Sequence, residues 1–257
     1  YDVRKDTFNA DVNSLENAIQ SVIEEEKLRP RVIIAVDLFG QPADYPAIEK
    51  LAEKYNLLVL EDGAQGFGGG IGKQRACSFG DAATTSFFPA KPLGCYGDGG
   101  AVFTNDDEVA DYLRSIRVHG KGSFKYDNVR IGWNSRLDTI QAAILQVKLK
   151  AFREYELDAV NKVAETYTEL LKDVVKTPIV PDGIYSSWAQ YTIRLESQEE
   201  RDALQTYLKG RDIPTMVYYP KPMHEQKAFD GIKQYVECPV TEELCKTVLA
   251  LPMHPYL

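Results

Sequence analysis

Arg31-Val-Ile-Ile-Ala-Val-Asp-Leu38 is the stretch that decides the fold. Its near-continuous apolar run is typical of a strand that is covered on both faces of a sheet. Apolar residues at helical spacing precede it over Val12–Ile23 and follow it over Ile48–Tyr55. A second apolar run, Leu57–Glu61, completes a strand–helix–strand unit. This order predicts an α/β fold with a largely parallel sheet and right-handed crossovers.

The rest of the chain predicts a second, smaller unit. After strands over 81–88 and 100–104, the pattern is helical from Leu137 to about Asp173, without proline or glycine, which is typical of a helix that bends or links domains. Beyond it we expect a small α+β domain with strands over 188–195 and 214–219 and helices over 199–209 and 241–251. We therefore expect a large domain over 1–150 and a linker helix with a small domain over 151–257, with a segment missing at each end.

Charge and composition exclude several classes of protein. The formal net charge of −8 argues against broad nucleic-acid binding, which needs a basic surface. No apolar run is long enough to cross a bilayer, and no signal-peptide pattern opens the chain. The cysteines lack the paired short spacings of a zinc site, so we expect no metal and reduced thiols in a cytoplasmic protein; they are Cys77, Cys95, Cys238 and Cys245.

A lysine and an acid each follow the end of an apolar strand. Lys91 lies in Ser86-Phe-Phe-Pro-Ala-Lys-Pro-Leu-Gly-Cys-Tyr-Gly-Asp-Gly-Gly100, and Asp62 closes Leu57–Glu61. Ligands of parallel sheets bind beyond the carboxyl ends of the strands, so we expect the two to converge. Burial would favour the neutral amine of Lys91, which can attack an aldehyde. An acid opposite a pyridine nitrogen keeps the ring protonated, so this pair predicts a pyridoxal phosphate site.

Four more residues are candidates for binding anions or a cofactor. Gln65 could hydrogen-bond near the cofactor, and the Ser86 hydroxyl could hold a phosphate oxygen. Asn134 and Arg136 come just before the long helix, whose N-terminus favours anions. Packing or capping would explain each of the four without a ligand. Lys91 could equally be a solvated lysine at a strand end, and Asp62 could be a helix N-cap or a turn acid.

Two phosphate-binding motifs can be excluded. Gly66–Gly72 lacks the last glycine of the dinucleotide fingerprint, which argues against a nicotinamide-dependent enzyme. In the run Gly72-Lys73-Gln74, Gln74 replaces the Ser or Thr of a P-loop.

Together these motifs resemble the DegT/DnrJ/EryC1/StrS family of pyridoxal-phosphate-dependent sugar aminotransferases, which have the aspartate aminotransferase fold (fold type I). Ser86–Gly100 and Gly132–Ala143 are most similar to enzymes that aminate the 3-keto group of UDP-linked N-acetylhexosaminuronic acids in surface-polysaccharide pathways. The other matching stretches, in the family's order, are 38–44, 61–65, 117–120, 218–224 and 251–257.

The resemblance implies a role for each candidate. Lys91 would carry the cofactor as a Schiff base, Asp62 would pair with its pyridinium nitrogen, Gln65 would lie against its ring or hydroxyl, and Ser86 would bind its phosphate. Asn134 would reach the phosphate in a neighbouring subunit, so the functional unit would be a homodimer with shared sites. Candidates for contacts with the sugar nucleotide are Arg136, His119, Tyr219 and His224.

The implied reaction transfers an amino group, expected from glutamate, to a keto-sugar nucleotide. Two alternatives stay open. A sugar dehydratase of the same family would have histidine in place of Lys91, which argues against it. A non-catalytic sugar-nucleotide-binding or dimerisation module is favoured because the family's N-terminal segment, whose Gly-Thr or Gly-Ser turn holds the cofactor phosphate, is not found before Tyr1. Gly63 also stands where the family usually has alanine or serine.

Overall fold

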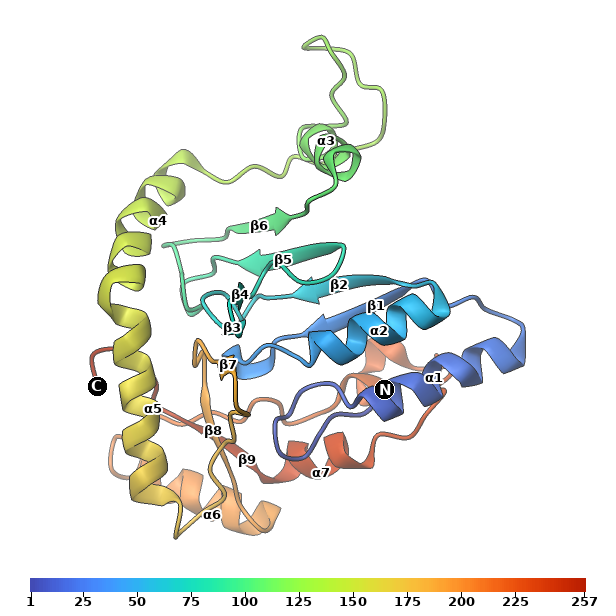
Figure 1. The fold of residues 1–257 in the computed structure, drawn as a ribbon. Coiled ribbons are helices and arrows are strands. Elements are labelled where there is room, and N and C mark those ends of the chain that lie inside the picture. The colour runs from blue at the N-terminus through green and yellow to red at the C-terminus, as the bar shows by residue number, and fades with distance from the viewer.

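The first sheet of the molecule is built from four strands. The computed structural model describes all of residues 1–257. The strand order of this sheet is β1 (Val32–Val36), β2 (Leu58–Asp62), β5 (Ala82–Ser86) and β6 (Gly100–Phe103), and the first three strands run parallel (Figure 1). Only β6 is antiparallel, so the prediction of a mostly parallel sheet is confirmed.

Two capped helices cover one face of this sheet. Asp11 accepts hydrogen bonds from the backbone N–H groups of Asn13 and Ser14 and so begins α1 (Val12–Glu25). Asp44 caps α2 (Tyr45–Tyr55), which has a proline in its first turn. The main hydrophobic core lies between these helices and the sheet, and it includes Leu15, Ile19, Ile33, Ala35, Tyr45, Ile48, Leu51, Val59 and Phe79.

The opposite face of the sheet is open. Ile33 is 3% exposed and Ile34 is 53% exposed, because successive strand residues point to opposite faces. Val32, Val36 and Leu58 are also exposed on the open side. The expectation that β1 is covered on both faces is therefore wrong for these 257 residues. A continuous apolar run shows that a strand can be buried, but it does not supply the layer that buries it.

The long helix bends where it crosses the loops of the sheet. It consists of α4 (Thr139–Ala151), a π-helical turn (Phe152–Glu156) and α5 (Leu157–Leu171), drawn yellow in Figure 1. Phe152 is buried with Leu93 and Leu145, and its ring occupies the space where a Cβ on Gly68 would lie. The π turn lets this one side chain point into the sheet loops while the helix continues.

The second unit differs from its predicted elements in two places. It contains β8 (Tyr191–Arg194), α6 (Gln198–Lys209), α7 (Pro239–Thr247) and β9 (Val248–Leu251). The helix expected to reach Leu251 ends at Thr247, and β9 pairs antiparallel with β8. Residues 214–219 form only a single bridge, between Met216 and Ala250. Short apolar runs suit a strand or a helix equally, and pairing with β8 decides between them.

The remaining elements are short. A three-stranded sheet joins β3 (Gly70–Ile71) to both β4 (Gln74–Arg75) and β7 (Ile184–Tyr185). The helix α3 (Asp107–Ile116) follows β6, and 3-10 turns lie at Leu38–Gly40, Met223–Glu225 and Lys227–Phe229. No helix combines the length and apolar character needed to cross a bilayer.

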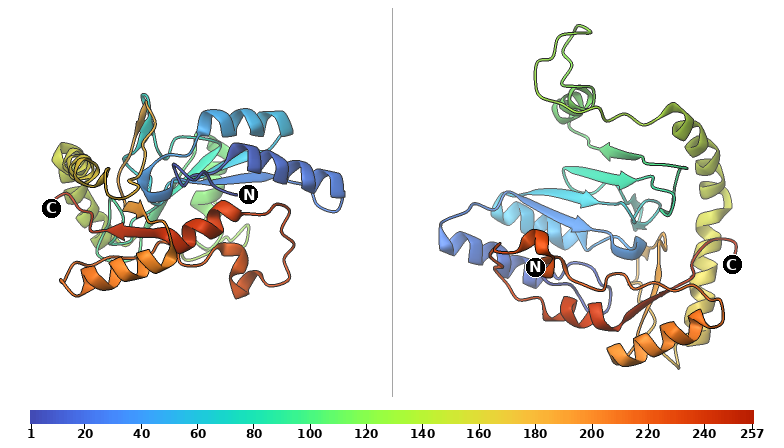
Figure 2. Two further views of the ribbon diagram at one scale, coloured as in Figure 1. Left: turned by 90° about the horizontal axis from the view of Figure 1, so that it is seen from below. Right: turned by 180° about the vertical axis from the view of Figure 1, so that it is seen from behind.

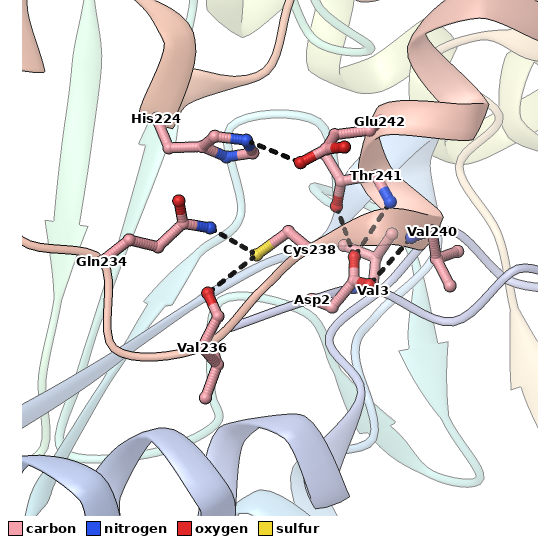
Figure 3. Close-up of polar contacts among 9 residues, drawn as sticks. All are labelled: Asp2, Val3, His224, Gln234, Val236, Cys238, Val240, Thr241 and Glu242. Carbon is pink, nitrogen blue, oxygen red and sulfur yellow. Dashed lines mark hydrogen bonds and ion pairs between the residues drawn. The ribbon is translucent and has the colours of Figure 1, made fainter.

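The first residues of the chain bind to the second unit. Figure 2 shows the N-terminal helices (blue) and the C-terminal unit (orange to red) as separate layers. Asp2 bridges them, because its carboxylate accepts hydrogen bonds from the backbone N–H groups of Val240 and Thr241 at 2.9 Å each (Figure 3). Phe8 packs with Phe39 and Leu244 in a shared apolar cluster.

Candidate active site

An acid and a hydroxyl lie on adjacent strands of the open face, at the carboxyl edge of the sheet. Asp62 pairs in register with Thr84 of the parallel strand β5. Ser86 is two residues further along β5, so it shares the face of Asp62 and lies roughly 7 Å beyond it along the strand. Adjacent parallel strands end together, so Asp62 and Ser86 lie at the same edge of the sheet. We call these two residues and Lys91, on the turn that follows Ser86, the polar edge.

The backbone of Asp62 is held in place, and its carboxylate has no cationic partner. The Asp62 carbonyl accepts from the Asp37 N–H at 3.0 Å, and the next N–H, of Gly63, donates to the Thr84 carbonyl at 2.8 Å. Its side-chain Oδ1 accepts only the Ala64 N–H, at 3.1 Å. No cation of the chain pairs with Asp62. A half-buried carboxylate of this kind can accept a hydrogen bond from a cationic ring nitrogen.

Lys91 lies on a tight turn directly after Ser86. Its backbone N–H donates to the Phe88 carbonyl at 2.9 Å, and the N–H of Cys95 donates to Phe87 at 2.8 Å. A Cβ at Gly94 would lie 2.5 Å from the Pro89 carbonyl oxygen, so this turn requires glycine. Lys91 is half-buried rather than fully buried, and its ammonium group makes no salt bridge or side-chain hydrogen bond. The amine is thus not used to hold the fold together.

Gln65 joins the polar edge to the second unit. Its Oε1 accepts the Phe39 N–H at 2.7 Å, and its Nε2 donates to the Tyr219 hydroxyl at 3.4 Å. The Ser187 hydroxyl donates to the Gln65 carbonyl at 2.7 Å. Buried Gln65 therefore has a fixed orientation, and Tyr219, which is 50% exposed, is brought beside it from the other unit.

Three candidates lie instead on an arm formed by residues 117–138, which projects beyond α3 (green, Figure 1). The His119 N–H donates to the Trp133 carbonyl at 2.8 Å, and the Arg136 guanidinium donates to Asn134 Oδ1. His119, Asn134 and Arg136 are exposed and hydrogen-bond to none of Asp62, Ser86 and Lys91. Within one chain the structure does not bring the arm residues into the polar edge.

His224 is engaged elsewhere. Its Nε2 lies 3.2 Å from Glu242 Oε1 on α7, beside the Asp2 cap (Figure 3). This contact accounts for the imidazole without a ligand. The resemblance assigned His224 to the sugar nucleotide, and that role stays a prediction.

A groove of about 880 Å³ runs along β5, β6 and α3. Thr85, Val102, Leu113, Trp133 and Leu137 are among the residues that line it. Asp62, Ser86 and Lys91 do not line it, so the groove and the polar edge are different features of the surface.

Two buried acids behind the polar edge were not singled out from the sequence. Asp37 and Glu61 are both fully buried. Burial raises the pKa of each carboxyl, and for Asp37 the charge of Glu61 raises it further. The signal available in the sequence was that both acids lie within apolar runs, each next to the end of a strand.

The predicted α/β fold of a type I transferase is confirmed by the match to solved aminotransferase structures. The family model of the DegT/DnrJ/EryC1/StrS aminotransferase family matches residues 1–257. The chain therefore belongs to this family of aminotransferases.

Individual relatives agree with this assignment. The chain is 45% identical to the UDP-2-acetamido-2-deoxy-3-oxo-D-glucuronate aminotransferase of Pseudomonas aeruginosa, over 100% of this chain and 68% of the relative. A crystal structure of a DegT DnrJ EryC1 StrS aminotransferase from Brucella abortus matches with a TM-score of 0.96 and 50% identity, over 100% of this chain and 68% of that one. NtdA from Bacillus subtilis, solved with bound cofactor PMP, matches with a TM-score of 0.82 and 27% identity, over 99% and 57%.

Proposed function

We propose that this chain carries the active-site residues of an aminotransferase that uses pyridoxal phosphate and aminates the 3-keto group of a UDP-linked hexuronate. The observation that carries the proposal is the unpaired amine of Lys91, one turn beyond the strand that presents Ser86 beside Asp62. The 45% identity to an enzyme named for a UDP-linked 3-oxo-glucuronate supports this substrate class. We propose glutamate as the amino donor, and surface-polysaccharide synthesis as the pathway, from the family resemblance.

The donor set of the polar edge fits the cofactor. A primary amine can bind an aldehyde, a carboxylate can hold a protonated pyridine nitrogen, and a hydroxyl can bind a phosphate oxygen. Lys91, Asp62 and Ser86 supply one group of each kind, and no salt bridge within the chain occupies the amine or the carboxylate. Gln65 would contact the ring through a side chain that is already fixed in orientation.

When bound, pyridoxal phosphate supplies an electron sink for the carbon that loses its proton. The chain supplies the rest. Asp62 would stabilise positive charge on the ring nitrogen, and Ser86 would hold one end of the cofactor. The Nζ atom of Lys91 would take the proton from the Cα atom of the amino-acid donor as general base, and as general acid it would deliver that proton to a different carbon. Tyr219, beside Gln65, is placed to contact the sugar.

We propose that the working unit is a homodimer in which the arm reaches the partner's polar edge. The arm exposes apolar side chains, with Ile131 at 95% and Trp133 at 71%. Large exposed apolar side chains that gather on one projecting segment indicate an interface. Asn134 would then meet the cofactor phosphate, and Arg136 and His119 the sugar nucleotide, of the other subunit. His224 stays a candidate within its own chain.

The division into a cofactor domain over 1–150 and a second domain over 151–257 is part of the proposal. The contact of Gln65 with Tyr219 supports it, since a substrate would bind between the two parts.

The cysteines form no disulfide, which supports a cytoplasmic location.

The test is Lys91→Ala, with Lys73→Ala as a matched control because Lys73 is an exposed lysine on a nearby loop. We expect Lys91→Ala to abolish both amino transfer from glutamate to a UDP-linked 3-keto-hexuronate and the visible absorbance that pyridoxal phosphate gives when bound to a lysine. Lys73→Ala should retain both. An unchanged rate in Lys91→Ala would overturn the proposal. Binding of the UDP sugar without cofactor or turnover in the unmutated protein would instead indicate a non-catalytic module.

A further inference from the structure

The carboxyl pair Asp37–Glu61 lies directly behind the polar edge, on the covered face of the sheet. Asp37 follows β1 and Glu61 precedes Asp62 in β2, and both side chains are fully buried. Two full negative charges in contact within a core are strongly unfavourable, since each charge loses its hydration and repels the other. No lysine or arginine forms a salt bridge with either group.

The hydrogen bonds assign different protonation states to the two acids. Glu61 accepts backbone N–H groups on both oxygens, from Cys77 on Oε1 and from Phe79 on Oε2, and both bonds require an acceptor. Asp37 uses only Oδ1 as an acceptor, for the Tyr45 hydroxyl at 2.8 Å and the Ala43 N–H at 3.1 Å. Its Oδ2 is buried and has no donor directed at it. An acceptor-rich carboxylate beside an oxygen without a donor is the arrangement of a shared proton.

We infer that Asp37 keeps its proton at neutral pH and donates it from Oδ2 to the Glu61 carboxylate. The pair then carries one negative charge instead of two, and it ties the end of β1 to the end of β2. Asp62 is the next residue in β2, and its backbone carbonyl accepts the Asp37 N–H at 3.0 Å. The protonation is inferred from the burial and the hydrogen bonds of the two acids, and it does not depend on the proposed function.

Other titratable groups around the pair do not supply a compensating cation. Tyr45 and Glu49 face it from α2, Cys77 faces it from the loop after β4, and Asp62 lies on the far side of β2. Gly66 closes the space beside Asp37, where a Cβ would lie 2.1 Å from Oδ2. The site is too tight for an added side chain and too acidic for a second ionised carboxylate.

The experiment compares Asp37→Asn with Glu196→Gln in the full-length protein without cofactor. Asparagine keeps a donor toward Glu61 and an acceptor for Tyr45. Glu196 is an exposed acid paired with Lys176, so its replacement removes one carboxylate without touching the core. We measure denaturant unfolding from about pH 5 to pH 7, above the usual pKa of aspartate, which is about 3.9. In this window unfolding of the unmutated protein releases the proton of Asp37.

We expect the unfolding constant of the unmutated protein, relative to that of Asp37→Asn, to rise about tenfold for each pH unit in this window. Infrared spectra at neutral pH should show a protonated carboxyl C=O band that Asp37→Asn loses and Glu196→Gln retains. Glu61→Gln places an amide N–H group opposite the backbone N–H of Cys77 or Phe79, so that two donors face each other. It should therefore destabilise the fold more than Asp37→Asn. A ratio independent of pH with no band lost would overturn the inference. Failure of Asp37→Asn to fold would do so too, since the amide reproduces the proposed hydrogen bonds.

Discussion

The two faces of the β1–β2 sheet give neighbouring residues opposite surroundings. Glu61 points toward α1 and α2, where it is fully buried, and Asp62 points to the open face with no partner cation. Ile33 and Ile34 divide in the same way, at 3% and 53% exposure. One face supports the structure, and the other presents groups for chemistry. Because side chains alternate between the two faces of a strand, two neighbouring residues can serve different purposes, one in the core and the other in the candidate site.

Between the two faces, the larger effect on activity should follow from the acid on the open face. Asp62→Ala removes the charge that would stabilise a cationic ring, and we expect kcat to fall by about 10² to 10³, or about 3 to 4 kcal/mol of barrier. Stability should change little, because Asp62 Oδ1 accepts only one backbone N–H. Steady-state kinetics and denaturant melts of the same sample measure both.

Glu61→Gln is the matched variant on the covered face. We expect it to lower the free energy of unfolding, because both Glu61 oxygens accept buried N–H groups. If Asp62→Ala retained a near-normal rate while Glu61→Gln lost activity in a stable protein, the assignment of the two faces would be reversed.

The isoleucine pair tests the scaffold side of the same comparison. Ile33→Ala opens a cavity in the main core and should cost roughly 3 kcal/mol of stability. Ile34→Ala should cost less than about 1 kcal/mol, since its side chain is half exposed. Urea unfolding of the two variants gives both values. Equal losses would show that a further layer covers the open face in the protein studied.

Asp2 extends the comparison to an acid whose pKa shifts in the opposite direction from that of Asp37. Burial opposes its ionisation, but hydrogen bonds from Thr241, Val240 and Val3 outweigh burial and lower the pKa of Asp2. Asp2 thus stabilises the protein above the usual aspartate pKa, and this contribution is lost as the pH falls through the lowered value.

We expect Asp2→Ala, which removes the cap of α7, to cost about 1 kcal/mol at pH 7, with the difference from the unmutated protein shrinking toward pH 3. Thermal melts over this range measure it. A difference that grew on acidification would contradict the assignment of Asp2 as an ionised cap.

Sequence patterns predicted the elements that make local contacts. The helices over α1 and α2 and the strands β1, β2 and β5 follow from apolar spacing. The strand β9 was mistaken for helix, because Val248–Leu251 is too short to show a period and is decided by pairing with β8. The sequence predicted that Asp62 and Lys91 lie just beyond strand ends; in the structure Asp62 is the last residue of β2, and Lys91 follows the last residue of β5, Ser86. The Asp37–Glu61 contact was not, since it depends on which side chains share a face of two strands.

The sequence by itself determined the order of the strands of the main sheet and of the helices between them, the polar residues at the strand ends, and the family, because these are properties of short stretches and of their spacing. Only the tertiary structure decided which face of β1 is covered, that Gln65 meets Tyr219 across the two units, and that two acids lie together in the core. Those features arise from contacts between residues far apart in the chain, and the free energy of such contacts depends on the packing of the whole molecule rather than on local preference.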